Sequence, residues 1–190
     1  MKFRRGYKKW ADNEALRWRK ELGLKKSDPL PARVLLDHLK IPYYPLDKLE
    51  GDPVLIDSLR KTLIGHWSAV AIKGKGQWFI VHHDQHSPAR QESDIMHEIS
   101  HILCEHSSTS IDDLNGIPLL KYNHEQEEEA KWLGGCLQLP VEALTYCLFN
   151  DITPQMISEK YTASSEMVKY RLNVSGAQRI FDRAKSKITS

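Results

Sequence analysis

The 190-residue sequence has few cysteines and no long apolar run. Its three cysteines, Cys104, Cys136 and Cys147, are odd in number and lack the C-x-x-C spacing of metal and redox sites. We therefore expect three reduced thiols in a cytosolic core. No apolar run approaches the roughly 18 residues of a transmembrane helix, so we expect no membrane span. The first residues are basic with no apolar segment behind them, which predicts a cytoplasmic protein without a secretory signal.

Internal repeats and low-complexity segments are also missing, and the composition is that of a globular protein, 41% hydrophobic and 27% charged. The length predicts one domain, or one domain with a small appendage. We expect a main domain over residues 1–150 and a C-terminal helical segment over residues 151–190. The net charge of +2 is unevenly distributed, because residues 1–26 and 155–190 are basic and residues 92–129 are acidic. We expect most of these charges to be solvated, and a nucleic acid or an acidic partner is the alternative.

The most informative feature is His97-Glu98-Ile99-Ser100-His101, an H-E-x-x-H sequence. Two histidines four residues apart on a helix point the same way and can bind one metal ion. Glu98 lies about 100° round the helix from His97 and about 60° from His101, beside the open coordination position. This is the pattern of zinc metallopeptidases, with two nitrogen ligands and a general base. Chance produces it in roughly one chain of this length in a hundred, so the context must decide.

The motif is expected to lie on a helix. Ser87 is a suitable N-cap, and it precedes a proline at the first helical position. Ile95 and Ile99 fall at helical spacing and indicate a buried stripe. No glycine or proline interrupts residues 89–106, which predicts a helix of about 17 residues ending at His106.

The third metal ligand is sought in the acidic run that begins at His124. One face of this second helix carries Ala130, Leu133, Gly134 and Leu137, with Gly135 as a further small residue. The small side chains would let the helix approach the motif helix closely, and extending the row backwards reaches Glu127. We predict that Glu127 is the third ligand, with Glu129 and His124 as alternatives. Glu125 and Glu128 are expected to be solvated in the first turn.

These residues resemble a known family, the ImmA/IrrE metallopeptidases. The resemblance is carried by residues 87–103, by the E-E-E-A sequence that starts at Glu127, and by the Leu-Gln-Leu-Pro run at 137–140. It extends to the N-terminal helix, the turn at residues 28–30 and the hairpin before the motif, and thus covers most of the chain. It implies that Glu127, the first glutamate of E-x-E-A, is the third zinc ligand. Gln138 departs from a commoner leucine but does not touch the proposed ligands.

The residues and the resemblance together predict a cytosolic zinc-dependent endopeptidase. His97, His101 and Glu127 would hold Zn2+, and Glu98 would be the general base that activates a water. The resemblance implies a selective protease whose protein substrate is a helix-turn-helix repressor. It also implies a role in transcription regulation, in a phage-like or stress-response setting.

Residues around the motif have weaker candidate roles. Asp94 could orient a histidine ligand, although capping or solvation would explain it equally well. His106 and Tyr122 are the candidates for stabilising an oxyanion, because they lie near the motif in sequence. Three more histidines precede the motif helix, at His82, His83 and His86. They lack helical pairing, so we expect structural or solvent-facing roles for them rather than a second metal site.

The rest of the chain predicts an α+β fold, with a small antiparallel sheet packed on the zincin-like motif helix. Residues 8–22 and 34–39 have helical patterns. Residues 41–46 predict a strand, and its prolines place it at a sheet edge. Residues 67–73 and 77–82 are β-rich runs separated by Gly-Lys-Gly, which predicts a hairpin.

Two short helices near the C-terminus, with N-caps at Thr153 and Ser164, resemble a helix-turn-helix. If this pair bound DNA, its candidate contacts would be Lys169, Tyr170, Arg171 and Asn173. We favour the interpretation that the pair packs on the main domain or forms a protein interface. The alternative to an enzyme is a non-catalytic protein that binds DNA or a regulator through this pair, and DNA is the less favoured partner.

Overall fold

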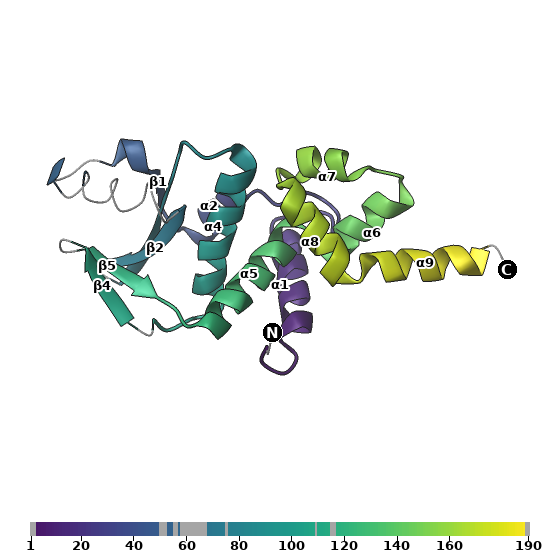
Figure 1. Ribbon diagram of the computed structural model, residues 1–190, viewed down its shortest axis with the longest axis horizontal. Helices are drawn as coiled ribbons and strands as arrows, with labels where there is room; N and C mark the ends of the chain where they lie inside the picture. The colour runs from purple at the N-terminus through teal and green to yellow at the C-terminus, as the bar shows by residue number, and fades with distance from the viewer. Residues whose placement is uncertain are drawn as a thin grey trace.

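The computed structural model describes residues 3–49, 53–54, 57, 68–74, 76–108, 110–114 and 117–188. Its described α-helices are α1 (Tyr7–Glu21), α2 (Ala32–Leu39), α4 (Pro88–Leu103), α5 (His124–Gln138), α6 (Val141–Phe149), α7 (Pro154–Tyr161), α8 (Ser165–Ser175) and α9 (Ala177–Ile188). Its described strands are β1 (Tyr43–Pro45), β2 (Ala69–Gly74), β3 (Gln77–His82), β4 (Ser110–Leu114) and β5 (Ile117–Lys121), and a 3-10 turn, η1 (Leu46–Lys48), follows β1. The fold is thus mixed α+β, with the strands at one end, α1, α4 and α5 in the middle, and α6 to α9 at the other end (Figure 1).

The main sheet has three strands in the order β1-β3-β2. β2 and β3 form the expected antiparallel hairpin, with Val70 opposite Val81. β1 runs parallel to β3 at the edge of the sheet, with Tyr44 opposite Val81. The prediction of a purely antiparallel sheet was therefore wrong, and that of an edge strand was right. A parallel pair needs a long connection, and the chain between Pro45 and Gln77 provides one.

Two parts of the predicted hairpin, Trp67 and Lys75, lie outside the described residues. A second hairpin, formed by β4 and β5, was not anticipated from the sequence. β5 lies against β2, so this hairpin stands beside the main sheet (Figure 1).

The motif helix α4 begins at its predicted N-cap, because the Ser87 side chain accepts a hydrogen bond from the backbone in the first turn. It ends at Leu103, earlier than the predicted end at His106. Glu105 adopts a φ of 53°, and the His106 N–H bonds to the carbonyl of His101 at 3.1 Å. This Schellman-type ending turns the chain back along the helix and brings the His106 side chain beside His101.

Helix α4 packs between the main sheet on one side and α5 on the other. Ile95, Met96 and Ile99 of α4 are fully buried against Leu133 and Leu137 of α5. Ile95 and Ile99 belong to the predicted stripe of α4, and Leu133 and Leu137 to that of α5, whereas Met96 was not part of either prediction. The contact between α4 and α5 therefore determines how the candidate ligands of the two helices face one another.

Glycines control the approach of α5 to its neighbours. A Cβ atom added at Gly134 would lie 3.3 Å from the backbone oxygen of Met96, so α4 and α5 are as close as they can be at this point. Gly135 faces away from α4, and a Cβ there would lie 2.9 Å from Cδ of Arg171 in α8. Only one of the two glycines thus serves the close approach that the sequence predicts.

Two buried arginines hold the C-terminal end of α5. Arg19 of α1 donates from Nη2 to the Leu137 carbonyl at 2.8 Å, and Arg171 of α8 donates from Nε to the Leu139 carbonyl at 3.0 Å. Both side chains are fully buried. They satisfy carbonyls that a helix end leaves without partners. The prediction that Arg171 could contact DNA was therefore wrong.

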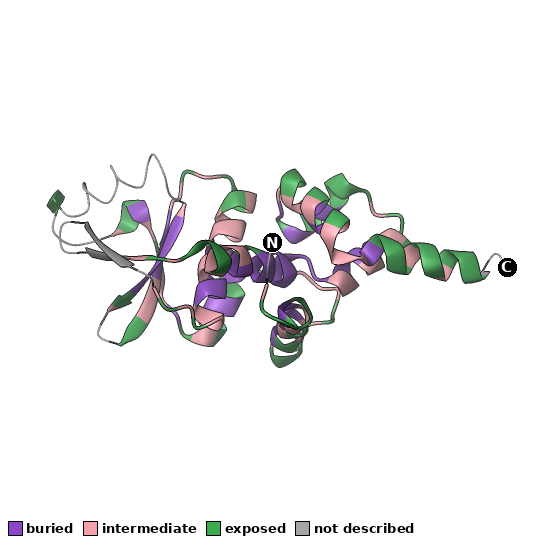
Figure 2. Cartoon of the chain, turned by 60° about the horizontal axis from the view of Figure 1, so that its bottom comes forward, coloured by how far each residue is buried: buried purple, intermediate pink, exposed green. Residues whose placement is uncertain are grey.

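The helices after α5 have an apolar cluster of their own. Its buried residues are Leu139, Ala143, Leu144, Cys147, Ile157, Tyr161, Ala163, Val168 and Ala177. α7 and α8 begin at the predicted N-caps, Thr153 and Ser164. The last helix, α9, is mostly exposed (Figure 2). The domain boundary at residue 150 and the helix-turn-helix character of α7 and α8 stay predictions.

The sequence also predicts that the chain has no membrane-spanning helix and that its three cysteines are reduced. Among the described helices, none combines the length and the apolar character needed to span a bilayer. Cys104, Cys136 and Cys147 are all free of disulfide bonds. Burial raises the pKa of the Cys136 thiol to about 12, which keeps it protonated and unreactive.

Candidate metal centre

His97, His101 and Glu127 meet between α4 and α5. The Nε2 atoms of the two histidines are 3.1 Å apart, and Oε2 of Glu127 lies 3.1 Å from the first and 3.7 Å from the second. Among the described residues, this is the one group of three such side chains with donor atoms close enough to share an ion. The structure therefore brings together the three residues that the sequence predicts as ligands.

The spacing of the three donor atoms fits a tetrahedral ion. Zinc bonds to nitrogen and oxygen ligands are about 2.0–2.1 Å long, so two ligand atoms of a tetrahedron are roughly 3.3–3.4 Å apart. The three observed separations, 3.1, 3.1 and 3.7 Å, lie around this value. Three protein donors leave a fourth corner for water or substrate, as catalytic zinc sites require.

The electrostatics of the group also favour a cation. The neighbouring His101 and His97 imidazoles hold the pKa of the Glu127 carboxyl well below its usual range. Burial lowers the pKa of His101 to about 4, so its imidazole is neutral and has a free lone pair at neutral pH. Burial acts to lower the pKa of His97 as well, but the Glu127 and Glu98 carboxylates outweigh it and raise that pKa. An ionised carboxylate and a neutral imidazole are the forms in which Glu127 and His101 can bind a divalent ion.

Glu98 lies beside the three donors and is held by the sheet. Its Oε2 accepts the backbone N–H of Ala71 in β2 at 2.8 Å. Burial raises the pKa of Glu98 to about 7, although the His97 side chain and the Ala71 N–H act against this rise. A carboxylate with a pKa near neutrality can both accept and return a proton, which is what a general base in hydrolysis must do.

A pocket of about 350 Å³ contains this group. The lining residues come from β2, α4, α5 and the end of β5, and they are Ser68, Ala69, Val70, Ala71, Asp94, His97, Glu98, His101, Leu120, Tyr122 and Glu127. The Glu127 side chain is 45% exposed, whereas that of His101 is 1% exposed. The metal position is therefore anchored in the interior and open toward the pocket.

Tyr122 and His106 lie on different sides of His101. The Tyr122 ring stacks on the His101 ring, with centroids 3.8 Å apart, and it lines the pocket. Its hydroxyl is buried without a partner among the described residues, and burial raises its pKa to about 12. It stays a candidate for stabilising an oxyanion. His106 does not line the pocket, and it contacts Nδ1 of His101, the ring nitrogen that faces away from the other candidate ligands. The prediction that His106 could stabilise an oxyanion is therefore wrong.

The alternative third ligands lie elsewhere. Glu129 is turned toward Arg4 and His106, and His124 is exposed at the start of α5. Glu125 is exposed as predicted. Neither alternative joins the group of donors that contains Glu127.

The other acidic and histidine residues near the motif also stay outside the group. Asp94 approaches His86 at 3.4 Å, and no hydrogen bond between described residues joins it to a histidine of the motif. The predicted role of Asp94 in orienting a ligand is therefore not observed. His83 and His86 stack on each other, and His82 is buried at the end of β3, the central strand of the main sheet. None of the three joins the group of candidate metal ligands among the described residues.

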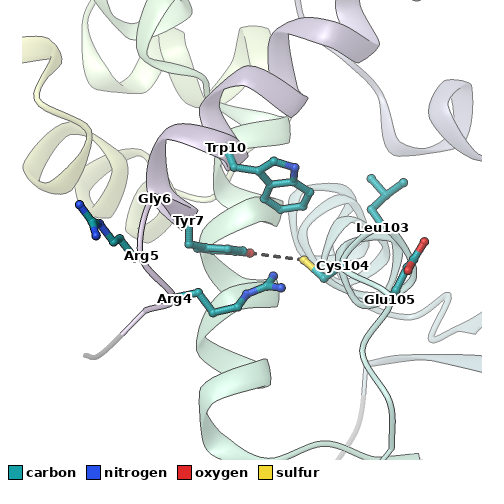
Figure 3. Close-up of a pocket in the computed structure, with 8 residues that line it drawn as sticks. All are labelled: Arg4, Arg5, Gly6, Tyr7, Trp10, Leu103, Cys104 and Glu105. Carbon is teal, nitrogen blue, oxygen red and sulfur yellow. Dashed lines mark hydrogen bonds between the residues drawn. The ribbon is translucent and has the colours of Figure 1, made fainter.

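A larger pocket, of about 470 Å³, lies at the C-terminal end of α4, around Leu103 and Cys104. Figure 3 shows Arg4 and Tyr7 pointing into it from the N-terminal segment, with the Tyr7 hydroxyl 3.4 Å from Sγ of Cys104. None of the candidate ligands lines this pocket. Pocket size alone would therefore have indicated the wrong place for the chemistry.

The C-terminal helices present a third surface. Lys169 and Asn173 are exposed on α8 and line a pocket with Pro154 and Gln155 of α7. Tyr170 is half-buried. With Arg171 buried, the proposed DNA-contact set has lost its one arginine, and DNA binding stays a less favoured prediction.

Comparison with known proteins identifies the family. The family model described as Peptidase_M78, the IrrE N-terminal-like domain, matches residues 59–173, which is well over half of the chain. The chain belongs to this family. The match contains the H-E-x-x-H sequence and Glu127, and it confirms the resemblance seen in the sequence. Membership of the M78 family supports a metallopeptidase-like function. The match is narrower than the resemblance, because α1 and the turn at residues 28–30 precede it.

Comparisons with curated proteins and with solved structures say less about the chain than the family model does. No curated protein matches the chain significantly. A solved structure of a Mycobacterium tuberculosis transcriptional regulator is similar, with a TM-score of 0.49 and 14% sequence identity. The similarity covers 85% of this chain and 46% of that one, so the chain spans less than half of the regulator's length.

Two parts of the candidate site were not foreseen from the sequence. The backbone N–H of Ala71 holds Glu98, and a backbone donor leaves no sequence signal. Glu129 contacts His106, and His106 contacts His101. Both residues were noticed in the sequence, but in other roles. The E-x-E spacing could have indicated a separate role for Glu129, because it places Glu129 on a different face of α5 from Glu127.

Proposed function

We propose that the protein is a cytoplasmic zinc-dependent endopeptidase that hydrolyses a peptide bond in a specific protein substrate. The observation that carries this proposal is the convergence of His97, His101 and Glu127, with Glu98 beside them in one pocket. Structural zinc sites are usually closed by four protein ligands. Three ligands next to a positioned carboxylate are instead the arrangement of a hydrolytic site.

Zinc is the ion that best fits the donor set. Two imidazole nitrogens and one carboxylate are ligands that zinc accepts in tetrahedral geometry, whereas magnesium and calcium prefer oxygen ligands in larger numbers. We assign His97, His101 and Glu127 as its ligands. When bound, zinc supplies a Lewis acid that polarises the scissile carbonyl and makes a nearby water more acidic.

Glu98 moves the proton in this proposal. The hydrogen bond from Ala71 fixes one carboxylate oxygen, so the other is left to accept a proton from the attacking water. The same carboxyl then returns the proton to the leaving amine. Burial prepares Glu98 for this exchange, because it raises the pKa of the carboxyl to about 7. Tyr122 is the side chain we assign to donate a hydrogen bond to the developing oxyanion, since its buried hydroxyl has no other described partner.

The pocket favours an extended substrate segment. One wall is the strand β2, which is at an edge of the described sheet, and the facing wall is formed by Leu120 and Tyr122. An extended peptide can pair with the backbone of an edge strand, which fixes its direction across a catalytic site. The resemblance to the ImmA/IrrE metallopeptidases further suggests a helix-turn-helix repressor as the substrate.

Co-expression tests this proposal. The protein is produced together with a helix-turn-helix regulator encoded beside its gene, as wild type and as Glu98→Gln. We expect the wild type to shorten the regulator and Glu98→Gln to leave it intact while keeping its zinc. Cleavage by Glu98→Gln at the wild-type rate would refute the general-base assignment. A regulator that stays intact with the wild type, at full zinc occupancy, would refute the repressor as substrate.

A further inference from the structure

A row of buried polar side chains leads from His101 away from the pocket. Nδ1 of His101 lies 3.0 Å from Nδ1 of His106, and Nε2 of His106 lies 3.2 Å from Oε2 of Glu129. Arg4 donates from Nε to the other oxygen of Glu129 at 2.9 Å. The side chains of His106 and Glu129 are only 4% and 7% exposed. The His106 imidazole and the Glu129 carboxylate are therefore limited to the partners in the row.

The chemistry of the partners sets the direction of every hydrogen bond. A carboxylate only accepts, so His106 must donate to Glu129 from Nε2. The other nitrogen of a neutral imidazole is an acceptor, and this nitrogen of His106 faces His101. His101 must then carry its proton on Nδ1. Its Nε2 is left with a lone pair, and that atom is the one that faces His97 and Glu127.

We propose that His106 and Glu129 are positioning residues that hold His101 in the tautomer that binds zinc. The inference rests on the proposed function, because it assigns the role through the zinc ligand His101. In many zinc sites a histidine ligand donates its second N–H directly to a carboxylate or a carbonyl. Here the carboxylate acts through an intervening imidazole, and the Schellman-type end of α4 places that imidazole.

The N-terminal segment fixes the far end of this row. Besides the Arg4 contact, the Tyr7 hydroxyl donates to the backbone oxygen of Glu129 at 2.5 Å. Figure 3 shows Arg4 and Tyr7 side by side, reaching from the start of α1 toward the end of α4. The orientation of one zinc ligand thus depends on a segment outside the part of the chain that matches the M78 family.

Glu129→Gln is the sharpest variant, because it changes the shape of the side chain very little. Arg4 can only donate, so the amide oxygen must face Arg4 and the amide nitrogen must face His106. His106 would then accept at Nε2 and donate from Nδ1. This reverses the direction of the hydrogen bonds along the row. The His101 proton then moves to Nε2, the atom that should bind zinc. We expect zinc affinity to fall about 10- to 100-fold, as for other partners of zinc-bound histidines.

Two measurements report on the proposal without any activity assay. Long-range proton–nitrogen NMR of the metal-free protein shows which ring nitrogen carries the proton. We expect Nδ1 for His101 and Nε2 for His106 in the wild type, and the reverse in Glu129→Gln. Competition with a chelator measures zinc affinity. Glu125→Gln is the matched control, because Glu125 is exposed on the same helix, and it should bind zinc as the wild type does.

His106 variants separate hydrogen bonding from packing. His106→Leu removes the acceptor and should weaken zinc binding about 10- to 100-fold. His106→Asn offers an amide oxygen near the position of Nδ1 and should restore most of the affinity. Denaturant unfolding of the metal-free variants shows whether each one is folded. An equal loss in both His106 variants would mean that only packing is involved and would overturn the proposal.

The failure of this proposal can be told apart from the failure of the proposed function. If the wild type binds no zinc but shows the expected tautomers, the zinc peptidase is refuted and the tautomer assignment stands. If the wild type binds zinc and Glu129→Gln keeps both its affinity and its tautomers, Glu129 has no positioning role. A wild-type His101 protonated on Nε2 in the metal-free protein would overturn the inference directly.

Discussion

Gly134 sets the distance between the two helices that carry the proposed zinc ligands. A Cβ at this position would lie 3.3 Å from the Met96 oxygen and 3.4 Å from the His97 nitrogen. Both contacts are with the backbone of α4, which cannot rotate away as a side chain can. Gly134→Ala must therefore separate α4 and α5 by a few tenths of an ångström at the level of His97.

The size of that displacement can be compared with the tolerance of the metal site. Zinc–ligand distances vary by only about 0.2 Å, so a shift of a few tenths strains at least one of three bonds. We expect zinc affinity to fall about tenfold, or about 1.4 kcal/mol. In the metal-free protein, overpacking should cost about 1–3 kcal/mol, and the better helix propensity of alanine should offset about 1 kcal/mol of it.

Gly135→Ala provides the matched control. It adds the same methyl group to the same helix, but the new Cβ meets the buried side chain of Arg171 at 2.9 Å rather than α4. We expect it to lower the free energy of unfolding without changing zinc affinity. Chelator competition and denaturant unfolding measure the two effects separately. Wild-type zinc affinity in Gly134→Ala, or an equal loss in Gly135→Ala, would refute this reasoning.

Three further substitutions test other parts of the account. Glu98→Gln should retain about one zinc per chain, while its cleavage rate should fall about 10²- to 10⁴-fold. A substrate-cleavage assay and metal analysis of the same sample measure the two quantities. Arg19→Met should leave the Leu137 carbonyl without a donor and lower the free energy of unfolding by about 2–4 kcal/mol; an unchanged unfolding curve would contradict its role. Burial raises the pKa of Glu92, which accepts the Ala32 N–H, so its ionised form opposes folding at neutral pH. Glu92→Gln should stabilise the protein near pH 7, and the gain should shrink as the pH falls through the raised pKa of Glu92, because the wild-type carboxyl is then neutral too.

The candidate site could be predicted because most of it depends on local geometry. The spacing of His97 and His101 on one helix fixes their common direction whatever surrounds them. Glu127 required a second helix in the right orientation, and it was found from the apolar row of α5 together with the resemblance to a known family. The N-caps of α4, α7 and α8 were likewise readable, since each depends on a few neighbouring residues.

The features that the sequence did not predict depend on contacts between distant segments of the chain. Arg171 has the sequence context of an exposed helix residue, and only its packing against the end of α5 shows that it is buried. The end of α4 was missed because Glu105, and not a glycine, adopts the positive φ that terminates the helix. The sequence position of His106 could not show which side of the His101 ring it contacts. The parallel pairing of β1 likewise depends on tertiary structure.

Anomalous diffraction at the zinc edge, from crystals of the zinc-loaded protein, tests the central claim most directly. We expect one peak at about 2.0–2.2 Å from Nε2 of His97, Nε2 of His101 and a carboxylate oxygen of Glu127. No fourth protein atom should coordinate the ion. A peak at another place, or a fourth protein ligand closing the site, would contradict the account.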